Sequence, residues 1–174
     1  MTIQELETYI EQYGNSIYAF CRKLCMDTEQ AEELYQEVWL KAVKDIRKIR
    51  SDENVKSYLL SIAVGIWKNR KKKYAVRDRI APAVPITEEM ESLLVDERDG
   101  ALAEILREER RQAVLQAIED LEDNYRIPVL LYYMEEQSVK EIAHALHIPQ
   151  GTVKRRLWVA RNKLSEKLEG YINE

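Results

Sequence analysis

Apolar residues recur at three- and four-residue spacing along most of the 174-residue chain, which is the period of a helix with one buried face. The first run begins at Thr2 and Glu5, a pair with the spacing of a capping box at a helix start. Gly14 lies within this run, and we expect it to bend or split the helix. The apolar positions of the run are Ile3, Leu6, Ile10, Tyr13, Ile17, Cys21 and Leu24. The pattern as a whole predicts an all-α fold.

Two further helices are expected in the first half of the chain. Asp27 or Thr28 caps the first of them, and its inner stripe consists of Leu34, Val38, Ala42 and Ile46. The sequence "RSDEN" ends this helix. The next helix begins at about Val55 and runs into the basic sequence "KNRKKKY", with an apolar side formed by Tyr58, Leu59, Ile62, Ala63 and Ile66.

The segment "APAVPITEEMESLLVDERDG", residues 81–100, contains two prolines, many acidic residues and only a weak apolar pattern. These features are typical of a linker. Helical periodicity resumes around Leu102 and continues through Ile105, Val114, Ala117, Ile118 and Leu121. We therefore expect two small helical domains, residues 1–76 and 106–174, joined by an acidic linker over residues 77–105.

The net charge of −4 conceals strong local differences. Residues 41–79 carry 13 basic and 4 acidic side chains, whereas residues 80–124 carry 4 and 13. Residues 1–40 are also acidic, with 2 basic and 8 acidic side chains. Different segments are therefore expected to meet different partners. For any single segment, a charged face that is simply solvated is the alternative.

Composition narrows the class of protein. Hydrophobic residues make up 45% and charged residues 33%, which is typical of a helix-rich globular protein. The N-terminal residues lack the pattern of a signal peptide, and no apolar run reaches the length of a membrane span, so we expect a cytoplasmic protein without membrane insertion. The chain has no Ser/His/Asp cluster and no Gly-rich phosphate loop, which makes an enzyme the least favoured class.

The two cysteines, Cys21 and Cys25, are four residues apart and are expected to share one buried helix face. A metal site would need further ligands, and His144 and His147 lie far away in the sequence. We therefore expect neither a metal nor a cofactor.

Residues 138–164 have the pattern of a helix-turn-helix. Ser138 caps a short helix whose inward positions are Ile142, Ala143 and Leu146, and Ile148 fills the turn. His147 occupies the turn position that requires positive φ, where many such motifs have Gly. The second helix opens at Pro149 and Gln150 or at Thr152, and its core positions are Val153, Leu157, Ala160 and Leu164.

The opposite side of this second helix is basic. Arg and Lys in such a position fit a major groove, where they meet guanine edges and phosphates. The alternative is an ordinary amphipathic hairpin with a solvated basic side. The candidate DNA-binding residues are Gln150, Thr152, Lys154, Arg155, Arg156, Trp158 and Arg161.

Three segments of the chain resemble one known family in the same order. "HIPQGTVKRRLWVARNKL" is similar to the "GTVKSRLxRARxxL" pattern of bacterial RNA polymerase sigma factors of the extracytoplasmic-function (ECF) group, and "LEDNYRIPVLLYYMEEQSVKEIA" resembles the "LPxxYRxVLxLxYxxxxSxxEIA" that precedes it. "DTEQAEELYQEVWLKAVKDI" is similar to the "AEDLxQExFLKxW" helix that binds core polymerase. "SYLLSIAVGIWKNRKKKY" resembles the "WLYxIAxNxxxDxxRR" element that melts the promoter.

The resemblance implies a sigma factor that recruits core RNA polymerase to promoters. Its N-terminal domain would melt the minus-ten element and its helix-turn-helix would read the minus-thirty-five element. Docking on the clamp helices of the largest polymerase subunit would involve Glu32, Glu33, Leu34, Gln36, Glu37, Trp39 and Leu40. Promoter melting would involve Lys56, Lys68, Asn69, Arg70, Lys71, Lys72 and Lys73. The polymerase flap and an anti-sigma factor are further implied partners.

The melting element departs from the family pattern at three positions. Val64 replaces the usual Arg, Gly65 the usual Asn, and Asn69 the usual Asp. The identity of the residues that read the minus-ten element is therefore open. Trp67 is expected to pack in the core rather than stack on a base. The acidic linker would thread the polymerase channel, and its negative charge would mimic nucleic acid against basic walls.

Two other functions compete with this interpretation. A helix-turn-helix regulator of another class would bind DNA without polymerase, but it needs neither the basic block after residue 55 nor the "AEELYQEVW" helix. A protein-interaction module that never contacts DNA gives no reason for Lys154 and Arg155 to lie opposite a buried stripe.

Overall fold

The computed structural model describes residues 2–47, 49, 54–78 and 101–172. Over these residues the chain forms helices and no strand, which confirms the predicted all-α fold. The first half contains α1 (Ile3–Cys25), α2 (Thr28–Lys44) and α3 (Val55–Asp78). The second half contains α4 (Ala101–Glu119), α5 (Asp123–Val129), the π-helix η1 (Leu130–Met134), α6 (Val139–Leu146) and α7 (Gln150–Ile172).

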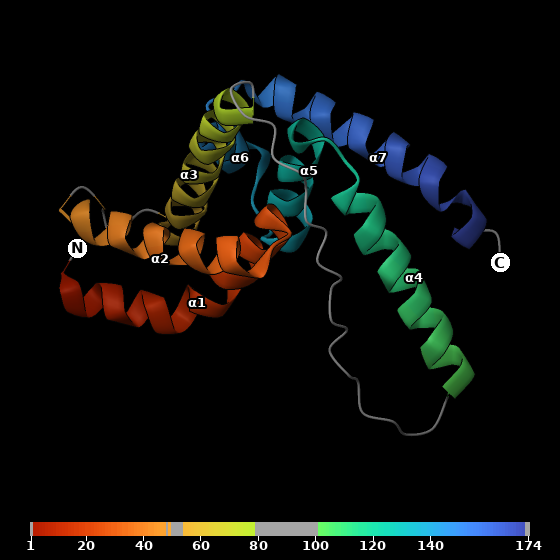
Figure 1. Ribbon diagram of the computed structural model, residues 1–174, viewed down its shortest axis with the longest axis horizontal. Coiled ribbons are helices and arrows are strands. Elements are labelled where there is room, and N and C mark those ends of the chain that lie inside the picture. The colour runs from red at the N-terminus through yellow and green to blue at the C-terminus, as the bar shows by residue number, and fades with distance from the viewer. Residues whose placement is uncertain (1, 48, 50–53, 79–100, 173–174) are drawn as a thin grey trace.

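The first three helices share one core. Helices α1 and α2 lie side by side and α3 crosses them steeply (Figure 1). Thr2 and Glu5 form the predicted capping box of α1, and Asp27 accepts from the backbone of Gln30 at the start of α2. The fully buried residues include Ile17, Phe20, Leu24, Leu34, Val38, Leu59 and Leu60. Trp67 is only 5% exposed, as expected for a packing residue.

Gly14 does not break α1, which is continuous from Ile3 to Cys25. Gly14 is buried, and a Cβ at this position would lie 3.1 Å from the hydroxyl oxygen of Tyr35 on α2. The expectation that the helix splits here was therefore wrong. This glycine allows α2 to approach closely, a packing requirement that is not visible in the spacing of apolar residues.

Helices α4 and α7 are long and diverge from each other, while the shorter α5, η1 and α6 pack near the start of α7 (Figure 1). Helix α5 begins after Glu122, so Pro128 is the sixth residue of its seven. The core of this half includes Val129, Leu131, Ile142, Val153, Leu157 and Ala160. The predicted inner positions of the two helices are therefore buried, except Leu164, which is half-buried.

The two halves pack against each other. Helix α3 lies against α6, and α1 contacts η1. Residues 77–78 and 101–105, which we assigned to the linker, are helical. Residues 79–100, which include most of the predicted acidic linker, lie outside the described residues, and the domain boundaries stay a prediction.

Candidate nucleic-acid and polymerase interfaces

The turn between α6 and α7 has the conformation that the sequence predicted. His147 ends α6 with φ 53° and ψ 46°, in the left-handed region. Ser138 and Glu141 form a capping box at the other end of α6, because the Ser138 side chain accepts from the Glu141 backbone and the Glu141 carboxylate accepts from the Ser138 backbone. Both ends of the short helix are therefore defined by local hydrogen bonds, which fixes the start of α7.

One side of α7 is buried and the other is open to solvent. Val153, Leu157 and Ala160 are at most 3% exposed. Lys154 and Arg155 are exposed, and Trp158 is 62% exposed. Gln150 is exposed and Thr152 half-buried at the start of the helix. We name the exposed residues Gln150, Lys154, Arg155 and Trp158 the recognition face.

Two predicted DNA-binding residues of α7 have other surroundings. Arg161 donates from Nε to the hydroxyl oxygen of Tyr133 on η1 at 2.6 Å, and its guanidinium lies 5.8 Å from the centre of that ring. Arg156 is half-buried and lines a cavity toward α3. Arg161 is thus paired within its own half and Arg156 faces the other half, and we include neither residue in the recognition face.

The predicted polymerase-docking residues on α2 divide into two groups. Leu34 is fully buried and Trp39 is 8% exposed, so these two position the helix. The exposed residues are Glu32, Glu33, Gln36, Glu37 and Leu40. Leu40 is 59% exposed, and Val43, three residues later, is 49% exposed and was not singled out from the sequence. Two exposed apolar side chains beside three carboxylates form one mixed face, which we name the α2 face.

Arg70 joins the α2 face to α3. Its Nη2 lies 2.9 Å from Oε1 of Glu37 and 3.6 Å from Oε2 of Glu33, and its Nη1 donates to the main-chain oxygen of Gln30. The Arg70 side chain is only 14% exposed. Although Arg70 was predicted to contact promoter phosphates, its charge is used here to orient the carboxylates of the neighbouring helix.

The remaining basic residues of α3 also differ in their surroundings. Lys56 pairs with Glu135 at 2.9 Å, and the Glu135 side chain is 2% exposed and accepts from Ser16. Lys71 pairs with Asp123 at 2.6 Å. Lys73 and Asn69 are exposed. Lys56 and Lys71 therefore tie α3 to the second half of the chain.

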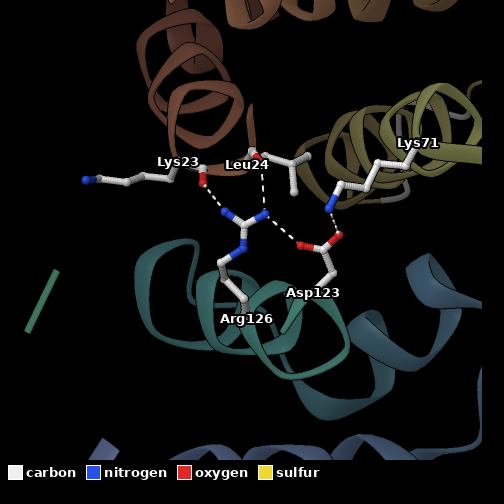
Figure 2. A network of polar contacts seen from close by, with 5 residues as sticks. All are labelled: Lys23, Leu24, Lys71, Asp123 and Arg126. Atoms are coloured by element: carbon white, nitrogen blue, oxygen red, sulfur yellow. Dashed lines mark hydrogen bonds and ion pairs between the residues drawn. The ribbon is translucent and has the colours of Figure 1, made fainter. Parts of the chain in front are cut away.

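A network of polar contacts between the two halves centres on Arg126 of α5 (Figure 2). The Arg126 side chain is 1% exposed. It donates to the main-chain oxygens of Lys23 and Leu24 and to the carboxylate of Asp123, which also receives Lys71. Sequence reasoning missed this network. The available signal was a pair of charged residues, Asp123 and Arg126, on the apolar segment before the helix-turn-helix.

The thiols of Cys21 and Cys25 are buried, as the sequence indicated. Burial raises the pKa of Cys21 to about 12 and that of Cys25 to about 11. Among the described residues, no group of three or more His, Cys, Asp or Glu side chains is arranged to hold a metal ion. No helix in the described ranges is both long enough and apolar enough to pass through a bilayer.

Comparison with known proteins assigns both halves. Residues 9–77 match Sigma-70 region 2, and residues 111–164 match Sigma-70, region 4. The chain is 31% identical over 165 residues to the ECF RNA polymerase sigma factor SigW of Bacillus subtilis, over 91% of this chain and 86% of SigW. It is 31% identical over 147 residues to the ECF RNA polymerase sigma-E factor of Escherichia coli, over 80% of this chain and 74% of that protein.

The fold has solved counterparts. The sigma factor RpoE from Bartonella quintana, solved in complex with the anti-sigma factor NepR, superposes with a TM-score of 0.79 at 20% identity over 96% of this chain and 98% of RpoE. CnrH, solved in complex with the cytosolic domain of CnrY, gives a TM-score of 0.64 at 18% identity over 97% of this chain and 90% of CnrH.

The fold and the sequence together define a helical DNA-binding protein that acts in transcription. The chain belongs to the ECF sigma factors of the sigma-70 family, as the resemblance of its three segments indicated. Its role is therefore promoter-specific initiation of transcription, which sigma factors perform as initiation factors rather than as enzymes.

Proposed function

We propose that this sigma factor reads the minus-thirty-five element with the recognition face of α7 and melts the minus-ten element with α3. The observation that carries the proposal is the division of α7 into two sides. Lys154, Arg155 and Trp158 are exposed on a helix whose other side is buried against the core, and α6 holds its start. A rigid helix that presents cations and one aromatic ring fits base edges and phosphates of a major groove.

Melting would depend on the basic residues of α3. Exposed Lys72 and Lys73 are available for phosphate contacts, whereas Lys56 and Lys71 would first have to leave Glu135 and Asp123 of the second half. Arg70 stays paired with Glu37 on α2, within its own half. Separation of the two halves would therefore add cations to the DNA-binding surface. This would account for the basic residues of α3 that are paired across the halves in this structure.

Core RNA polymerase would bind through the α2 face. Glu33 and Glu37 are held by Arg70, and Leu40 and Val43 offer apolar area beside them. A mixed surface of this kind fits the clamp helices of the largest polymerase subunit, while the polymerase flap would hold the C-terminal half. The acidic linker would occupy the polymerase channel, in the cytoplasm where transcription takes place.

An anti-sigma factor is a further proposed partner. RpoE was solved in complex with the anti-sigma factor NepR, and CnrH in complex with the cytosolic domain of CnrY. Likeness of fold supports a similar kind of partner here.

Reconstitution with purified core polymerase tests the function directly. We expect the holoenzyme to initiate at a defined set of promoters when transcript starts are sequenced on genomic DNA, and we expect core alone to lack those starts. As a matched pair, Arg155→Ala on the recognition face should shift the promoter set, whereas Lys167→Ala farther along α7, where Lys167 pairs with Asp120, should not. Tight sequence-specific binding by the free chain, without any core-dependent start, would favour a stand-alone regulator instead.

A further inference from the structure

A cavity of about 240 Å³ lies between the two halves of the protein. Helix α3 contributes Lys68 and Lys72, and α7 contributes Arg156. Its apolar lining comes from Ile127 of α5 and Leu146 of α6. Residues of α3 and of three helices in the second half of the chain therefore line one space.

Three of the cations that line this cavity have no matching anion. Within the described part of the chain, Lys68, Lys72 and Arg156 have no ion pair and no hydrogen-bond partner, in contrast to Lys56 and Lys71 on the same helix. Burial, and after it the positive charges of Arg156 and Lys72, lower the pKa of Lys68 below its usual value. Lys68 and Arg156 are half-buried and Lys72 is exposed. Like charges held near one another cost free energy, and the cost rises where they are partly buried.

The acidic residue of the cavity does not relieve this repulsion. Asp123 lines the space, but its carboxylate oxygens receive Arg126 at 2.8 Å and Lys71 at 2.6 Å. It is therefore already neutralised by two cations of its own, and it leaves Lys68, Lys72 and Arg156 unmatched.

Trp67 supplies an independent sign of a missing acceptor. It lines the same cavity, and its buried Nε1–H has no acceptor among the residues that the structure describes. A buried donor without a partner costs free energy, and such groups in a native fold call for an explanation. An anionic oxygen within reach of this nitrogen would serve the indole donor as well as the cations that line the cavity.

We propose that this cavity is a binding site for a small phosphate anion of two or more negative charges, of the size of pyrophosphate. Its volume is below the roughly 300–1,000 Å³ of pockets for drug-sized ligands, which favours a compact anion. Lys68 and Lys72 on one side and Arg156 on the other match several phosphate oxygens at once. The bound anion bridges α3 and α7. It therefore favours the arrangement seen here, in which the two halves are packed together (the closed arrangement), over one in which they are separate.

A consequence follows that rests on the proposed function. Lys68, Lys72 and Arg156 all belong to the sets predicted to contact promoter DNA. An anion that occupies them in the closed arrangement competes with DNA phosphates for the same charges. The anion would therefore reduce promoter engagement, whereas binding of the anion itself requires only the free chain.

Isothermal titration calorimetry of the full chain with inorganic pyrophosphate tests the site. We expect saturable binding of one pyrophosphate per chain, at least tenfold weaker in Lys68→Gln and in Arg156→Gln. The matched controls are Lys73→Gln and Arg155→Gln, which remove the same charge from the same two helices at exposed positions outside the cavity. Titration with ADP distinguishes a site for free pyrophosphate from a site for a nucleoside diphosphate. If the cavity excludes the nucleoside, pyrophosphate binds and ADP does not.

The comparison among variants decides the proposal. Equal weakening in the cavity variants and in the controls would show attraction to the general basic surface, and it would overturn the proposal, as would the absence of binding to the folded wild-type chain. Small-angle X-ray scattering provides a second readout, since pyrophosphate should reduce the radius of gyration of the wild type and leave that of Arg156→Gln unchanged. A failure of promoter competition with intact pyrophosphate binding would reject the consequence and leave the site standing.

Discussion

Arg126 on α5 donates from Nη2 to the main-chain oxygen of Leu24 on α1 at 3.1 Å, across a sequence separation of 102 residues. The same guanidinium donates to the main-chain oxygen of Lys23 and to the carboxylate of Asp123. The last carbonyl groups of a helix have no hydrogen-bond donor within the helix. At the end of α1, two of these carbonyls accept from Arg126. A side chain of the second half therefore completes a helix of the first half.

Arg126→Ala should both destabilise the protein and loosen its two halves. The free energy of unfolding should fall by about 1.5–3 kcal/mol, the range for hydrogen bonds to a charged group. Urea denaturation measures the loss, and small-angle scattering should show a larger radius of gyration. Arg111→Ala is the matched control, because Arg111 pairs with Glu108 on the exposed surface of α4 and should change neither quantity.

Arg155→Ala should weaken promoter binding by holoenzyme without loss of helicity, because Arg155 is exposed on the recognition face. If Arg155 contacts a base edge, the loss is about 1–3 kcal/mol and preference relaxes at one promoter position. If it contacts phosphate only, binding falls evenly across promoters and the salt slope shrinks by about one unit. Gel-shift titration at two salt concentrations separates these outcomes, and a drop in helicity would contradict the assignment of this side as DNA-facing.

Leu40→Ser should weaken association with core polymerase while the fold stays intact. Leu40 is 59% exposed, so it contributes little to the core, yet its burial in a complex would be worth up to about 2 kcal/mol. Val114→Ser, an exposed apolar position on α4, is the control. Equal affinity of both variants and wild type for core, measured by fluorescence titration, would move the docking surface away from α2. Glu37→Lys should weaken the same association further, since it also opposes Arg70.

Gly14→Ala should destabilise the protein, although alanine has a higher helix propensity than glycine. A Cβ at this position would press on the hydroxyl of Tyr35, whose ring is held edge-on by both Tyr18 and Trp39. Gly65→Ala provides the opposite case, because a Cβ there meets nothing within 4 Å. It should stabilise α3 by up to about 1 kcal/mol. Thermal unfolding of the two variants should therefore shift in opposite directions.

Because of the two buried thiols, we expect the free energy of unfolding to decline at alkaline pH. The folded-state pKa values of about 12 for Cys21 and about 11 for Cys25 lie above the ordinary 9.0, so the unfolded chain loses these protons first. Stability from this source is complete below about pH 9 and is lost as pH rises through these folded values. Urea denaturation at a series of pH values should show a steeper decline in the wild type than in the double variant Cys21→Ala and Cys25→Ala. Identical slopes would contradict the protected state of the thiols.

The recurring apolar positions were sufficient to predict the helices and much of the core. Leu34, Val38, Val153 and Leu157 are all buried, because a helix with one apolar stripe can bury only that side. The left-handed residue His147 and the cap at Ser138 were equally predictable, since both depend on neighbours within four residues. The membership of the family was readable for the same reason, as its motifs are local.

Which charges are free was decided by the tertiary structure alone. Arg70 and Lys72 both lie in one basic run, yet Arg70 is paired with α2 and Lys72 faces a cavity. Gly14 looked like a helix breaker because spacing along one helix carries no information about the ring of Tyr35 on the next. The sequence by itself thus determined the helices, their buried sides and the family, which depend on short-range periodicity. The partners of Arg126 and Glu135 required the packed fold, because such contacts join residues about a hundred positions apart and no local pattern records them.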